Sequence, residues 1–190
     1  MNRLEQKGFY KRAKLPHFDA LGEVQFITYR LADSLPDTAL KRLIELPPVK
    51  RTPKILQWLD SGHGSCSLRI PEVAALVQEN LLYFDGDRYD LVAWVIMPNH
   101  VHVLIECNVA WPLNKIVQSW KSYTAKRANE VLHRTGQFWQ PDYFDRVARN
   151  PDETEAIARY IEYNPVAAGL AKHAMDWPFG SAGYRGTLCC

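Results

Sequence analysis

The stretch "MPNHVHVLIE", Met97–Glu106, places two histidines one residue apart in an otherwise apolar run. Its residues alternate as in a β-strand: valines and an isoleucine occupy one face, and His100, His102 and Leu104 occupy the other. Side chains two residues apart on a strand project from the same face, with Cα atoms roughly 6.5–7 Å apart. The two imidazoles can therefore converge on one divalent ion. The same spacing also occurs when both histidines are simply polar residues on a solvated face.

Alternation and helical spacing outside this stretch predict the remaining elements. "MPN" punctuates two apolar runs and indicates two strands joined by a tight turn. The predicted strands are 22–32, 88–97, 100–106 and 136–148. The predicted helices are 34–46, 71–84, 111–134 and 150–165, and residues 47–70 are predicted to be a surface excursion between the first two helices. This order predicts an α+β fold in which helices cover one side of an antiparallel sheet.

Composition is consistent with a folded chain. The 190 residues are 47% hydrophobic, which supports a single domain over 1–190. The longest apolar run, "LVAWVIM", is far too short to span a bilayer, and no apolar segment follows the basic residues near the start. We expect a cytoplasmic protein with no membrane partner. The four cysteines have no zinc-ligand spacing and are expected to be free thiols.

Basic residues are concentrated in separate segments of the nearly neutral chain. Residues 1–17 and 113–134 each carry a local charge of +4. Such segments are compatible with a surface that binds DNA phosphates, although solvated helix faces explain the charge equally well. The candidate DNA-binding residues are Lys121, Lys126, Arg127, Arg146 and Arg149.

The last predicted helix carries a second candidate pair. Asn150 and Glu153 are spaced as the two residues of a capping box. Tyr160 and Asn164 are four residues apart and therefore share a helix face. The Asn164 amide can supply a third metal ligand while the Tyr160 phenol attacks a polarised phosphate. Alternatively, Tyr160 packs in a core and Asn164 ends the helix before Pro165.

Several motifs occur together in the order of a known family. "MPNHVHVLIE", "WKSYTAKRAN", "FWQPDYFDRVARN", "YIEYNPVAAGL" and "DWPFGSAGY" resemble the REP-associated tyrosine transposases. The stretch "LPHFDALGEVQFITYRLADSLP" is similar to the N-terminal strand region of that family. These proteins belong to the single-tyrosine nucleases that carry a His-hydrophobe-His motif.

The resemblance implies a fold and a site. It implies a ferredoxin-like or RRM-like antiparallel sheet with helices packed on it, with His100 and His102 as metal ligands on a central strand. Tyr160 matches the nucleophile, and Asn164 matches the third metal-side residue, where related insertion-sequence transposases more often have Gln. The implied cofactor is Mg²⁺ or Mn²⁺. The implied partner is single-stranded or hairpin DNA, bound by a monomer or a homodimer.

Three functional hypotheses follow. The first is a transposase-like endonuclease that nicks and joins hairpin-forming repeats through a covalent 5′-phosphotyrosine. The second is a metal phosphoesterase in which the histidines activate water and no covalent intermediate forms. The third is a non-catalytic hairpin-DNA-binding protein on a transposase scaffold. An adduct between Tyr160 and DNA separates the first hypothesis from the other two.

Overall fold

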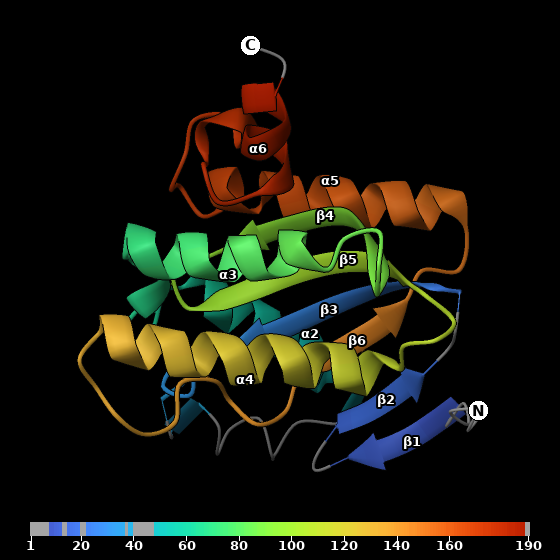
Figure 1. Cartoon of the computed structure of the whole chain (residues 1–190), viewed down its shortest axis with the longest axis horizontal. Coiled ribbons are helices and arrows are strands. Elements are labelled where there is room, and N and C mark those ends of the chain that lie inside the picture. Colours follow the sequence, from blue (N-terminus) through green and yellow to red (C-terminus); the bar gives the residue numbers. More distant parts are fainter. Residues whose placement is uncertain (1–7, 13–14, 20–21, 37, 40–47, 189–190) are drawn as a thin grey trace.

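Four antiparallel strands form the central sheet of the computed structural model (Figure 1). They are β3 (Val24–Arg30), β4 (Tyr89–Ile96), β5 (His100–Cys107) and β6 (Phe144–Val147), arranged in the order β4-β5-β3-β6. Helical connections separate β3 from β4 and β5 from β6, which gives the β-α-β-β-α-β arrangement of ferredoxin-like folds. The predicted fold class is therefore confirmed, with the histidine strand β5 in the middle of the sheet.

The structure describes residues 8–12, 15–19, 22–36, 38–39 and 48–188. Within this part, β1 (Gly8–Arg12) and β2 (Leu15–Asp19) form a separate two-stranded antiparallel sheet. Most of the helix predicted at 34–46 lies outside the described residues. No helix of the described chain is long and apolar enough to cross a bilayer.

Helices pack on both faces of the sheet. On one face, α3 (Pro71–Tyr83) and α4 (Leu113–Val131) lie side by side and bury most of the large apolar side chains (Figure 1). On the other face, Ile157 and Ile161 of α5 (Pro151–Ala167) pack against a smaller cluster of strand residues. The prediction that helices cover only one side was wrong. The periodicity of α5 indicated an apolar stripe but could not indicate which face of the sheet it covers.

The strand alternation predicted for β5 is confirmed. Val101, Val103 and Ile105 belong to the cluster under α3 and α4, whereas Leu104 belongs to the cluster under α5. Because side chains alternate along a strand, His100 and His102 project from the same face as Leu104. The candidate site thus lies on the face that α5 covers.

The stretch 47–70 contains regular structure. It forms α2 (Pro48–Asp60) and the short 3₁₀ helix η1 (Ser67–Arg69). Leu59, near the end of α2, is buried against Leu35, and Leu68 joins the main core. The packing of Leu59 fixes the last turn of α2, which matters because Asp60 is its final residue.

The C-terminal segment covers the edge strand β4. After η2 (Ala174–Asp176), the Phe179 carbonyl accepts a 2.8 Å hydrogen bond from the Ile96 amide. α6 (Ser181–Leu188) then lies beside the same strand, where the Arg185 guanidinium donates to the Val92 carbonyl. Pairing of this kind protects an edge strand from association with other chains.

Candidate active site

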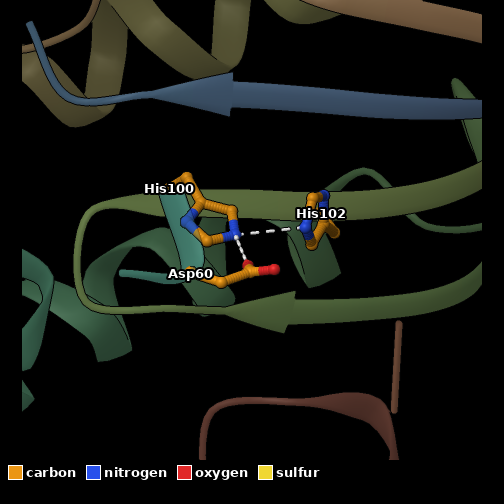
Figure 2. A group of neighbouring side chains, drawn as sticks. All are labelled: Asp60, His100 and His102. Carbon is orange, nitrogen blue, oxygen red and sulfur yellow. Dashed lines mark hydrogen bonds and ion pairs between the residues drawn. The ribbon is translucent and has the colours of Figure 1, made fainter. Parts of the chain in front are cut away.

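The two histidines of β5 are fully buried and face each other. Both His100 and His102 have 0% exposure, and their Nε2 atoms are 3.1 Å apart (Figure 2). The other nitrogen of each ring has a partner: His100 Nδ1 is 2.7 Å from Asn99 Oδ1, and His102 Nδ1 is 2.7 Å from Thr28 Oγ1. The Asn99 amide is itself fixed because its nitrogen donates to the His63 carbonyl. Hydrogen bonds of this kind orient imidazoles in metal sites.

Burial keeps both imidazoles neutral. It lowers the pKa of His102 to about 3, and burial together with the neighbouring His102 lowers the pKa of His100 well below its usual value. An amide oxygen only accepts hydrogen bonds, so His100 carries its proton on Nδ1 and directs a lone pair from Nε2. The Thr28 hydroxyl can donate or accept, and therefore supports either tautomer of His102. A neutral imidazole that directs a nitrogen lone pair at the ion is the form that binds a metal.

Asp60 joins the pair from α2. Its Oδ1 lies 3.7 Å from His100 Nε2, and the ligand atoms of Asp60, His100 and His102 all lie within 4.8 Å of one another (Figure 2). Burial raises the pKa of Asp60 to about 6, so the carboxylate is mostly ionised at neutral pH. Asp60 was absent from the sequence prediction. It lies within 47–70, the stretch predicted as a surface excursion, and no spacing in the sequence connects it to the histidines.

Tyr160 lies beside the histidines of the same chain. Its ring centroid is 5.6 Å from that of His102 and 6.1 Å from that of Phe26. Phe26 in turn stands 5.3 Å from His102, so one aromatic residue of β3 holds both rings in place. The Tyr160 side chain remains 41% exposed, which leaves access from solvent.

The Tyr160 hydroxyl has a raised pKa. Burial and the nearby Asp60 charge raise its pKa to about 12, and the side chain of Asn164 acts in the opposite direction. At neutral pH the phenol is therefore protonated. Since Asp60 lies 3.7 Å from His100 and its charge also raises the pKa of Tyr160, the carboxylate, the phenol and the imidazoles occupy one site.

Asn164 lies in this region with an unused acceptor. The residue is 3% exposed, and its Oδ1 has no hydrogen-bond partner within the described chain. An unpaired buried amide oxygen is costly, and a cation is one group that would satisfy it. The ligand atoms of Asp60, His100 and His102 are close enough together to hold a divalent ion, and the Asn164 oxygen is a further buried acceptor.

The helix that carries Tyr160 begins as predicted. Asn150 Oδ1 accepts a hydrogen bond from the Glu153 amide, and the Glu153 carboxylate accepts one from the Arg149 amide. The helix was predicted to stop near Pro165 but continues to Ala167. Asn164 is consequently helical, and its side chain shares a helix face with Tyr160.

The predicted DNA-binding residues are divided between the two faces of the sheet. Three of them, Lys121, Lys126 and Arg127, belong to α4, on the face opposite the histidines. The Lys121 ammonium donates to the Gln140 and Pro141 carbonyls and so supports the segment before β6.

The other two predicted DNA-binding residues lie in β6 and just before α5. Arg146 is opposite Phe26 in the strand register and forms a 3.3 Å ion pair with Glu153. Arg149 is exposed just before α5. Of the predicted set, Arg146 is therefore the residue that the strand register assigns to the face with the histidines.

Comparisons with known proteins find similar sequences and a similar fold. Residues 75–164 match the family model described as "Transposase IS200 like". The chain is 28% identical over 95 residues to a REP-associated tyrosine transposase of Escherichia coli (strain K12), and 25% identical over 103 residues to a relative from Haemophilus influenzae. These matches cover 49% of this chain and 54% and 58% of the relatives, so the chain spans little more than half their length.

A solved structure supports the fold. It is that of a REP-associated tyrosine transposase bound to a REP hairpin, and it covers 90% of this chain and 82% of its own with a TM-score of 0.54 at 18% identity. The matched stretch 75–164 contains His100, His102, Tyr160 and Asn164, whereas Asp60 lies outside it. Residues 75–164, which carry the two histidines and Tyr160, are thus similar to the family described as "Transposase IS200 like".

Proposed function

We propose that the chain is a metal-dependent enzyme that nicks single-stranded DNA at hairpin-forming repeats and rejoins it through a 5′-phosphotyrosine at Tyr160. The observation that carries this proposal is the position of the Tyr160 ring, 5.6 Å from the ring of buried His102 in the same chain. A relative in sequence is a REP-associated tyrosine transposase, and a transposase of that kind with a similar fold is bound to a REP hairpin, which supports hairpin repeats as the substrate class.

His100 and His102 are proposed to hold Mg²⁺ or Mn²⁺. Two ligands at right angles around an ion at about 2.1 Å stand about 3.0 Å apart, close to the 3.1 Å between the Nε2 atoms. Asp60 and Asn164 would add oxygen ligands, and the two nitrogens favour Mn²⁺ somewhat over Mg²⁺. When bound, the ion supplies a Lewis acid that polarises a phosphate oxygen.

Tyr160 is proposed as the nucleophile. Its oxygen forms a bond to phosphorus while the bond from phosphorus to the 3′ oxygen breaks, and the phenolic proton is balanced by the proton that the 3′ hydroxyl acquires. The number of phosphodiester bonds is unchanged, so rejoining requires no nucleotide triphosphate. Phe26 orients the phenol, and Asn99 and Thr28 orient the imidazoles.

The test is an adduct assay on labelled single-stranded hairpin repeats that flank the gene of origin. With Mn²⁺, the unmodified protein should retain label through denaturing electrophoresis, and Tyr160→Phe should abolish this retention. Tyr163→Phe is the matched control, because Tyr163 lies on the same helix but is 60% exposed. His100→Ala should also remove the adduct.

Two other outcomes would refute the proposal. Cleavage that survives Tyr160→Phe without any adduct would indicate a metal phosphoesterase. Hairpin binding without metal-dependent cleavage by the unmodified protein would indicate a non-catalytic DNA-binding module.

A further inference from the structure

Arg30 emerges from the sheet next to the histidine pair. In the antiparallel register of β3 and β5, Arg30 is opposite His100 in the same way that Thr28 is opposite His102. Directly opposite residues project from the same face of a sheet, and the 2.7 Å contact between Thr28 and His102 demonstrates this for their pair. Arg30, two residues from Thr28, therefore leaves the same face beside His100.

The hydrogen bonds of Arg30 hold its guanidinium without neutralising it. Nη1 donates to Ser34 Oγ at 2.9 Å and to the Leu31 carbonyl at 3.5 Å, and both acceptors are uncharged. Burial lowers the pKa of Arg30 to about 10 while the Asp142 charge acts in the opposite direction, so the group is protonated at neutral pH. The Nε and Nη2 atoms carry further N–H groups that these bonds do not use.

The surroundings of Arg30 connect it to the metal site. Ser34, its hydrogen-bond partner, is fully buried, and the next residue, Leu35, packs against Leu59 of α2. Leu59 immediately precedes Asp60, whose carboxylate reaches His100. The guanidinium is thus anchored to the same small cluster that positions Asp60. By contrast, Arg146 on the same sheet face is already paired with Glu153.

We propose that Arg30 binds a backbone phosphate of the DNA strand that enters the metal site. This inference rests on the proposed function and adds a substrate-binding residue to it. A planar guanidinium with free N–H groups matches the oxygens of a phosphate and can bind two of them. Arg30 also lies outside the matched stretch 75–164, so its role here is derived from the strand register and contacts alone.

The first experiment measures binding without chemistry. Fluorescence anisotropy of a labelled oligo-dT strand in EDTA, over a series of KCl concentrations, reports affinity and its salt dependence. Arg30→Gln should weaken binding about tenfold, the range expected for one charge-assisted hydrogen bond. It should also reduce the slope of log K against log salt by about 0.7, the value for one phosphate contact on a single strand.

Two variants make this result specific. Arg30→Lys keeps the charge but not the fork, so it should retain the salt slope and recover part of the affinity. Arg134→Gln removes one charge from an exposed arginine that follows α4, on the other side of the sheet, and should leave slope and affinity unchanged. The melting temperature of each variant reports any loss of stability from removing the hydrogen bond between Arg30 and Ser34.

The outcomes separate this inference from the proposed function. If Arg30→Gln lowers the melting temperature but matches Arg134→Gln in slope and affinity, Arg30 only tethers residues 31–34 and the inference is overturned. If the unmodified protein forms no DNA adduct while Arg30→Gln still weakens oligo-dT binding, the nuclease proposal fails and the phosphate contact stands. If both the nuclease proposal and the phosphate contact hold, Arg30→Gln should raise the DNA concentration for half-maximal adduct formation and lower the maximal rate. The factor for the concentration should be about tenfold larger than the factor for the rate.

Discussion

Thr28→Val tests whether the second hydrogen bond of His102 prepares the metal site. The Thr28 side chain is 4% exposed, and its hydroxyl lies 2.7 Å from Nδ1 of fully buried His102. Valine has the same shape and suits a strand, so the substitution removes the hydroxyl and little else. The imidazole then loses the partner that fixes its rotation and leaves a buried Nδ1 unpaired.

The expected effects follow from these contacts. Removal of a partner that orients a metal-binding histidine typically weakens metal affinity 10–100-fold, which is about 1.4–2.7 kcal/mol. The unpaired nitrogen should also destabilise the metal-free protein by about 1–3 kcal/mol, and each kcal/mol should lower the melting temperature by about 2–4 °C in a chain of this size.

Titration calorimetry with Mn²⁺ on the metal-free protein measures the affinity, and differential scanning calorimetry measures the stability. Thr28→Ser is the matched control because it keeps the hydroxyl and loses only a methyl group. It should bind Mn²⁺ within about threefold of the unmodified protein. If Thr28→Val binds Mn²⁺ as tightly as Thr28→Ser, the hydroxyl does not prepare His102 and the reasoning is wrong.

Three further substitutions test other contacts. Asp60→Asn removes the carboxylate near His100 and should weaken Mn²⁺ binding at least about tenfold in equilibrium dialysis; unchanged binding would exclude Asp60 as a ligand. Asn164→Leu removes a buried unpaired oxygen, so the metal-free protein should melt no lower, whereas the stabilisation by added Mn²⁺ should shrink. A lower melting temperature without metal would instead indicate a structural role for the amide. Lys121→Met removes the ammonium that donates to Gln140 and Pro141 and should lower the melting temperature by about 2–6 °C while oligo-dT affinity stays within about twofold; a larger loss of affinity would restore Lys121 as a DNA contact.

Local sequence patterns predicted much of the fold because each depends on neighbouring residues. Alternation placed His100 and His102 on one strand face, and the capping residues Asn150 and Glu153 located the start of α5. Tyr160 and Asn164 also share a helix face as predicted, because the helix continues past Pro165. The prediction of an early stop relied on the usual bias of the residue before proline, which tertiary packing of α5 on the sheet overrides.

The parts that the sequence did not predict depend on contacts between distant segments. Asp60 reaches the site because Leu59 packs against Leu35, and neither residue lies in a periodic pattern shared with β5. Similarly, charge alone could not separate Lys121, which supports backbone carbonyls, from Arg146, which lies on the histidine side of the sheet. Charge patterns report how many cations a segment has but not which layer of the fold receives them.

The register between β3 and β5 is the long-range information that would have completed the site. Once Thr28 is aligned with His102, alternation assigns Phe26, Thr28 and Arg30 to the histidine face without further structural data. Those three residues then account for an aromatic contact to Tyr160, a hydrogen bond to His102 and a cation beside His100. A shift of one residue would turn all three toward α3 and α4 and leave the histidines with Gln25, Ile27 and Tyr29 as neighbours. The pairing of these two central strands therefore determines the chemistry of the site as directly as the histidines themselves do.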